Sequence, residues 1–158
     1  MEIVAACLLT AAFAIYCACD DDLQITLGKP VKHVQQWLIR AAVVALLCVV
    51  IGLSWLAIGL AGLFSAVFRY TLNRLRGLSP FYVSPSNWYD WFWLWLGSMP
   101  GHGMYFGALI WARANFAKNW NHYHEGWEPW VNWSHRGGRI AYAVELLTFV
   151  AVLLMHVL

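Results

Sequence analysis

Residues 41–68 read AAVVALLCVVIGLSWLAIGLAGLFSAVF and contain no charged side chain. As one helix this stretch would span about 42 Å at the normal helical rise. The hydrocarbon core of a bilayer is only about 30 Å thick. Together with a more polar approach from residue 33, the stretch predicts a single helix over residues 33–68 that tilts or projects beyond the membrane.

The composition of the whole chain agrees with a lipid environment. Of its 158 residues, 61% are hydrophobic and 11% are charged, whereas a soluble domain carries about 25% charged residues. The net charge is only +2 and the basic residues are scattered along the chain, which argues against a nucleic-acid partner. The lipid bilayer is therefore the expected partner.

Three further apolar stretches predict helices over residues 3–19, 88–118 and 139–158. The stretch 88–118 is interrupted by GSMPGHG at residues 97–103, and this proline and these glycines predict a kink or break. The expected fold is an all-α membrane protein with one domain over residues 1–158. It would consist of about four transmembrane helices, the third kinked or broken.

Small residues form a seam along the stretch 41–68. With Trp55 among them, they recur at alternating spacings of four and three, at Ala41, Ala45, Cys48, Gly52, Trp55, Gly59, Gly62 and Ala66. This spacing keeps one face of a helix toward a partner. Small side chains let membrane helices approach closely. The glycines of this seam, Gly52, Gly59 and Gly62, are expected to pack against the first helix.

The chain is rich in tryptophan, and all of its eleven tryptophans except Trp37 and Trp55 lie within residues 88–133. Tryptophan favours the boundary between membrane and water. We expect a belt at one membrane interface, formed by Trp120, Trp127, Trp130 and Trp133.

The sequence around this belt also predicts a short interfacial helix. Glu128-Pro129 suits a helix start, because proline is favoured in the first turn. Gly137-Gly138 suits a helix end.

Histidines and carboxylates close to the belt are candidate ligands of a metal ion. On a helix, His122 and Glu125 would share a face, and His135 could supply a third ligand. The spacing matches no common zinc pattern. No cofactor is predicted, and a bound metal ion remains a minor alternative.

Two ionisable residues fall within apolar stretches and are candidates for catalysis or transport. Glu145 lies in the last stretch and His102 in the glycine-rich interruption. A charge in hydrocarbon is costly, so such residues commonly have a function. Glu145 could relay protons or bind a cation, or it could form a structural hydrogen bond to a neighbouring helix.

The sequence contains no phosphate-binding loop, nucleophile elbow or pair of catalytic carboxylates. We therefore expect a protein that is not an enzyme, acting as an accessory or structural subunit that associates with itself or with other membrane subunits. One alternative is a membrane enzyme or a small ion or proton transporter using Glu145 and His102. Another is a pore-forming or lysis-type protein.

The basic residues also predict an orientation. In a four-span chain the first and third loops share a side and carry most of the lysines and arginines. Because positively charged loops stay in the cytoplasm, both termini are expected on the non-cytoplasmic side of this multi-pass protein.

Overall fold

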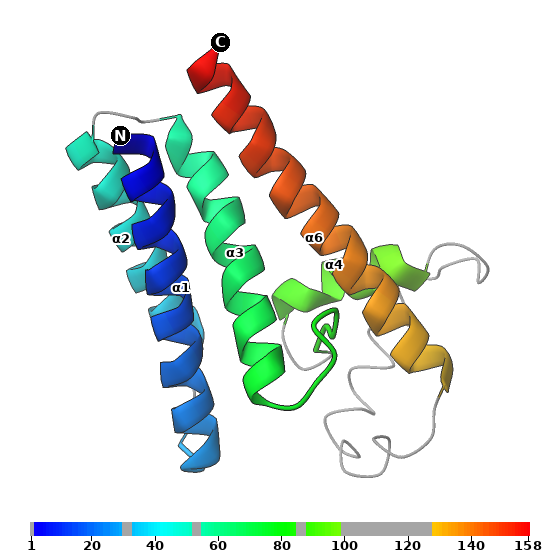
Figure 1. The fold of residues 1–158 in the computed structure, drawn as a ribbon. Helices are drawn as coiled ribbons and strands as arrows, with labels where there is room; N and C mark the ends of the chain where they lie inside the picture. Colours follow the sequence, from blue (N-terminus) through cyan, green and yellow to red (C-terminus); the bar gives the residue numbers. More distant parts are fainter. Residues whose placement is uncertain (1, 30–32, 52–54, 85–87, 99–127) are drawn as a thin grey trace. The chain divides into compact units, whose positions relative to one another are not determined.

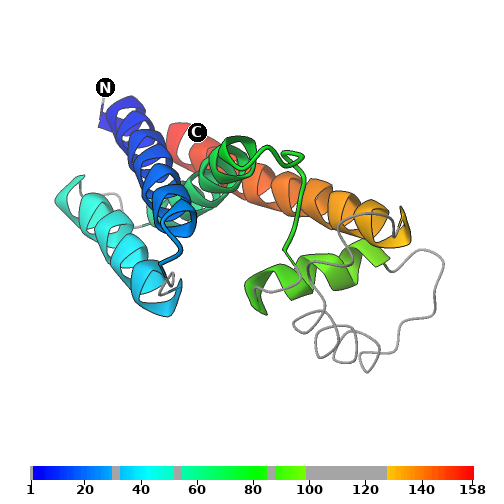
Figure 2. The same cartoon turned by 90° about the horizontal axis from the view of Figure 1, so that it is seen from below.

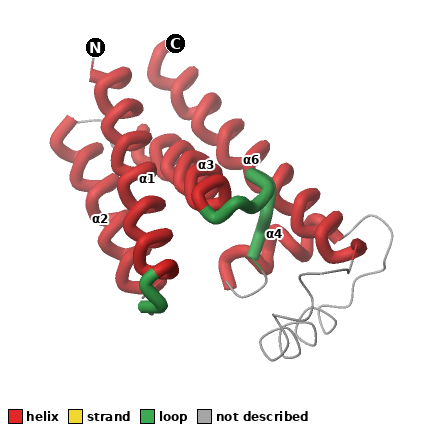
Figure 3. The backbone as a smooth tube through the Cα atoms, turned by 60° about the horizontal axis from the view of Figure 1, so that its bottom comes forward, coloured by secondary structure: helices red, strands yellow, loops and turns green. Residues whose placement is uncertain are grey.

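The computed structural model describes residues 2–29, 33–51, 55–84, 88–98 and 128–158. The helices are α1 (Glu2–Thr26), α2 (His33–Ile51), α3 (Leu56–Leu75), α4 (Trp88–Ser98) and α6 (Glu128–Val157). Within the described residues the chain forms helices and loops and no strand (Figure 3). The all-helical fold class is therefore confirmed for this part of the chain.

Among the described residues, three helical segments are long and apolar enough to cross a membrane. They are α1, α3 and residues His135–His156 of α6. The apolar part of α2, Gln35–Val49, is shorter. These segments indicate a membrane protein, as the composition predicts.

The chain divides into two compact units. The first unit comprises Met1–Leu78 and Ala143–Leu158, and the second comprises Ser79–Tyr142. Each is described separately below.

The prediction of one helix over residues 33–68 is wrong. In the first unit α2 ends at Ile51 and α3 begins at Leu56, and the two helices run in opposite directions (Figure 1). Each is close to the bilayer thickness at 1.5 Å per residue, about 29 Å for α2 and 30 Å for α3. The apolar stretch, which is too long for one membrane-spanning helix, thus contributes to two helices. In the sequence, the weak helix formers Gly52 and Ser54 lie between them.

This division also separates the predicted seam into two parts. Ala41 and Ala45 on α2 are exposed, as is Trp55, whereas Gly59 on α3 is buried. The seam therefore does not form one continuous contact with the first helix.

The helices of the first unit pack around α3. α1 packs mainly against α3, and α2 contacts both (Figure 2). Phe13 on α1 lies against Phe64 on α3, with ring centroids 5.6 Å apart. α1 and α3 run in the same direction, whereas the C-terminal part of α6 runs opposite to α3 (Figure 1).

One apolar core joins all four of these segments. Its buried side chains are Ala6 on α1, Val44 and Cys48 on α2, and Leu56 and Leu60 on α3, and two α6 residues, Phe149 and Val152, pack against it. Many other large apolar side chains on α1 and α2 are exposed, which suits helices surrounded by lipid.

In the described part of the second unit, other backbone segments approach α6 closely at two adjacent glycines, Gly137 and Gly138. A Cβ on Gly137 would clash with the main-chain carbonyl of Trp93 in α4, and a Cβ on Gly138 would clash with that of Phe81. The absence of side chains lets these two backbones approach the helix. Tyr142 strengthens the contact, because its hydroxyl donates a hydrogen bond to the carbonyl of Pro80 at 3.2 Å.

The predicted helix start at Glu128-Pro129 is confirmed, whereas the predicted helix end at Gly137-Gly138 is wrong. α6 continues without interruption from Glu128 to Val157, with both glycines in its interior. These glycines are required for close packing and do not end the helix. The predicted break over residues 97–103 is not tested, since α4 ends at Ser98 and residues 99–127 lie outside the described ranges.

Gly138→Ala tests the packing of the second unit. The added methyl group meets a rigid main-chain carbonyl at Phe81, so we expect the free energy of unfolding to fall by about 1–3 kcal/mol. Ala143→Leu, at an exposed position of the same helix, should change it little. Denaturant titration in detergent would measure both, and equal stability of Gly138→Ala and the wild type would contradict the close contact.

Candidate functional site: a buried ion pair

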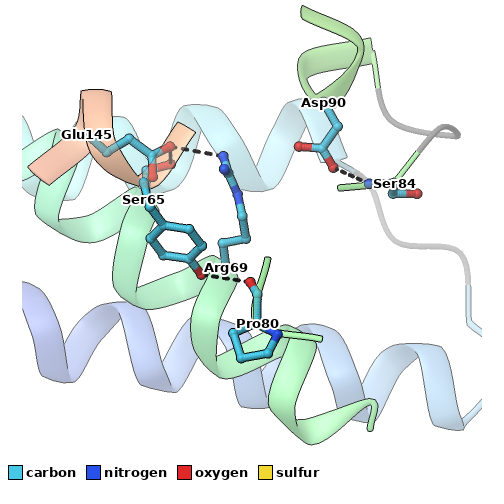
Figure 4. A network of polar contacts seen from close by, with 7 residues as sticks. Ser65, Arg69, Pro80, Ser84, Asp90 and Glu145 are labelled. Atoms are coloured by element: carbon cyan, nitrogen blue, oxygen red, sulfur yellow. Dashed lines mark hydrogen bonds and ion pairs between the residues drawn. The ribbon is translucent and has the colours of Figure 1, made fainter. Parts of the chain in front are cut away.

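The strongest candidate site lies between α3 and α6 in the first unit (Figure 4). The carboxylate of Glu145 accepts a hydrogen bond from the hydroxyl of Ser65 at 2.7 Å and from Nη2 of Arg69 at 2.9 Å, both at Oε1. The side chains of Arg69 and Glu145 are only 9% and 6% exposed. The contact is thus a buried ion pair with a neutral donor beside it.

The local sequence explains why these groups meet. Ser65 and Arg69 are four residues apart, so they lie on the same face of α3. Gly62 lies one turn before Ser65, and a Cβ there would be 2.6 Å from the main-chain oxygen of Glu145. The missing side chain lets α6 come close enough for its carboxylate to reach both donors.

The ion pair neutralises two charges that would be costly in the membrane. Arg69 is six residues before Leu75, so it lies about 9 Å from the end of α3 by helical rise. A buried charge pair often adds little net stability, whereas a buried charge without its partner is strongly unfavourable. A sliding of α6 along α3 that separated Glu145 from Arg69 would therefore be unfavourable.

A second ion pair lies at the same level of α3, toward α1 and α2. Nη2 of Arg40 on α2 lies 2.6 Å from Oδ1 of Asp21 on α1. The guanidinium of Arg40 also lies over the ring of Phe68, 4.6 Å from its centroid. Phe68 and Arg69 are adjacent on α3. This helix therefore contacts the Arg40–Asp21 pair through Phe68 and contributes Arg69 to the pair with Glu145.

The structure places only some of the predicted site residues. Glu145 is described, whereas His102, His122 and Glu125 lie outside the described residues. His135 lies on α6 and is half-buried. In the described part of the chain, no group of three or more His, Cys, Asp or Glu residues is arranged to hold a metal ion.

The predicted packing glycines have a different partner from the expected one. Gly59 faces the side chain of Val152, and Gly62 faces the main chain of Glu145, so both contact α6. The expectation that they pack against the first helix is wrong, because α1 packs against another part of α3. Gly52 lies outside the described residues.

Most of the predicted tryptophan belt is also outside the described part. Neither the backbone nor the side chain of Trp120 and Trp127 is described. Trp130 and Trp133 belong to the backbone of α6, but their side chains are not described. The interfacial belt therefore stays a prediction.

Sequence reasoning identified Glu145 but missed its partner. Arg69 falls on the four-three spacing that continues from the small-residue seam, and an arginine on that face was a usable signal. The pairing of Asp21 with Arg40 had no comparable signal, because it depends on how α1 and α2 are aligned.

Comparison of the chain with known protein families, with curated proteins and with solved structures finds no match. In the part of the chain that the structure describes, the fold defines an all-helical protein with three apolar segments long enough to cross a membrane.

Proposed function

We propose that this protein is a non-catalytic accessory or structural subunit of a membrane assembly, formed with copies of itself or with other membrane subunits. The carrying observation is the engagement of Glu145 by Arg69 and Ser65. A carboxylate that transports a cation must exchange its partner during each cycle. Here an arginine occupies the carboxylate, and separating the two would leave uncompensated buried charges.

The exposed surface of the first unit supports the same proposal. Large apolar side chains cover the outward faces of α1 and α2. In a membrane these faces can contact either lipid or other helices. An accessory subunit needs such faces on helices that stay together, and the two ion pairs link α1 to α2 and α3 to α6.

A small proton or cation transporter is the second candidate. Ser65, Arg69 and Asn73 are spaced by four residues and form a polar stripe on α3, with Arg69 and Asn73 buried. This stripe extends from Glu145 toward the end of α3. Such residues inside a membrane commonly mark a proton or ion pathway, with His102 as a further candidate.

Two measurements on purified protein separate these functions. Native mass spectrometry after mild detergent extraction should give a defined stoichiometric assembly. Proteoliposomes containing the protein should take up protons no faster than empty liposomes. Proton uptake that is lost in Glu145→Gln, with assembly unchanged, would reject the accessory role and support transport.

We further propose that both termini lie on the non-cytoplasmic side. Residues 1–28, 41–68 and 140–158 contain no lysine or arginine. α1 and α3 run in the same direction, so their C-terminal ends lie at the same end of the first unit (Figure 1). Lys29 follows α1, Arg74 lies in the last turn of α3 and Arg76 follows it. With a single helix over residues 33–68, these arginines would instead belong to the second loop of a four-span chain, on the side opposite to the first and third loops. The positive-inside rule favours a cytoplasmic location for this basic end.

Cysteine labelling tests this orientation. In a variant whose four native cysteines are replaced by alanine, Glu2→Cys should react with a membrane-impermeant maleimide on intact cells. Lys29→Cys should react only after permeabilisation. The reverse pattern would place the termini in the cytoplasm.

A further inference from the structure

α1 and α3 end in the same type of cap at the same end of the first unit. Gly28 and Gly77 have positive φ angles of 66° and 68°, which suits glycine after a helix end. The main-chain N–H of Lys29 donates to the carbonyl of Gln24 at 2.9 Å, and that of Leu78 donates to Asn73 at 2.8 Å. These bonds hold the chain around Lys29 and Arg76 in a defined position at the two helix ends.

The outermost charges at this end are basic. Lys29, Arg74 and Arg76, which we call the basic rim, are all exposed. The acidic residues of α1 lie further from its end. Asp21 is paired with Arg40, Asp20 accepts a hydrogen bond from Gln24 at 2.7 Å, and Asp22 is partly exposed.

Exposed aromatic residues lie just inside the basic rim. Trp37 on α2 is 61% exposed and Tyr70 on α3 is 52% exposed. Trp37 is four residues after the start of α2 and Tyr70 five residues before the end of α3, which correspond to depths of about 6 and 8 Å. Aromatic residues at this depth, with cations beyond them, are typical of a segment at the headgroup level of a membrane.

We propose that the basic rim binds the headgroups of acidic phospholipids. The rim carries three exposed positive charges, and Trp37 and Tyr70 would fix their depth relative to the lipid phosphates. Charge complementarity favours acidic over zwitterionic lipids, because basic residues beside a membrane are attracted to its negative surface charge. This inference rests on the membrane placement of α1 and α3 and not on the accessory role.

Lipid selectivity measures the proposed interaction. The protein is reconstituted into nanodiscs with equal parts of phosphatidylcholine and phosphatidylglycerol, and native mass spectrometry counts the lipids that it retains. The wild type should retain phosphatidylglycerol preferentially. The triple variant Lys29→Gln/Arg74→Gln/Arg76→Gln should lose about fivefold in selectivity per residue, or about a hundredfold in total. High salt should reduce the wild-type preference, since it screens exposed charges.

Controls separate lipid binding from effects on folding and on function. Glu2→Gln, at the opposite end of the first unit, should keep the wild-type selectivity. Arg74 and Arg76 also lie beside the C-terminal dipole of α3, but loss of that contact would lower stability equally in both lipids. A folded triple variant with unchanged selectivity would overturn the proposal. If the triple variant does not fold, Lys29→Gln is tested in its place. The proposal would then be overturned if this single variant kept the wild-type lipid preference and the wild-type preference did not depend on salt. Failure of the lipid proposal would not bear on the accessory role, which the assembly and proton-uptake measurements test separately.

Discussion

Replacing Glu145 with leucine is expected to lower the free energy of unfolding by about 3–5 kcal/mol, because it leaves the charge of Arg69 buried without its partner. Arg69 loses its hydrogen bond to the carboxylate, and Ser65 loses its acceptor. Titration of the detergent-solubilised protein with a denaturing detergent, followed by circular dichroism, would measure the loss. Arg69→Leu should have an effect of similar size for the reciprocal reason.

The double variant Arg69→Leu/Glu145→Leu is the decisive control. Replacing both members of a buried ion pair with apolar residues is often neutral or stabilising, so the double variant should recover most of the stability. The stability of Glu145→Gln should lie between those of the wild type and Glu145→Leu. Its amide oxygen can still accept a hydrogen bond from Ser65, but the amide cannot neutralise Arg69. Additive losses in the double variant would show that the two side chains do not act as a pair.

Replacing Gly62 with leucine should be the second large effect. The new side chain would begin 2.6 Å from the main-chain oxygen of Glu145, and a main chain held in a helix cannot move aside cheaply. Overpacking of this kind typically costs about 1–3 kcal/mol and occasionally more, and we expect the upper part of that range. The separation of α6 from α3 should also break the ion pair.

A graded series on α3 checks this contact. Ala61→Leu, at the exposed position next to Gly62, should leave stability nearly unchanged. Gly59→Ala should cost less than Gly62→Ala, because its new Cβ would lie 3.0 Å from the Cβ of Val152, whereas that of Gly62→Ala would lie only 2.6 Å from a main-chain oxygen. Equal losses for Gly62→Leu and Ala61→Leu would mean that α6 does not pack closely at Gly62.

The candidate site was only half predictable from the sequence. A carboxylate within an apolar stretch is unusual by itself, so Glu145 was identified without a structure. Its partner was not, because Arg69 reaches it only when the C-terminal part of α6 lies antiparallel to α3. The small residues on α3 were also recognised as packing positions, but which helix they face depends on contacts between distant segments.

By itself, the sequence determined that the described chain is helical and apolar enough for a membrane. These properties follow from local composition and from the lengths of apolar stretches such as residues 41–68. The tertiary structure decided that this stretch forms two antiparallel helices, that Gly137 and Gly138 lie inside α6, and that Arg69 is the partner of Glu145. Local preference cannot determine these features, because a glycine can end a helix or permit close packing, and only the position of the neighbouring backbone distinguishes the two.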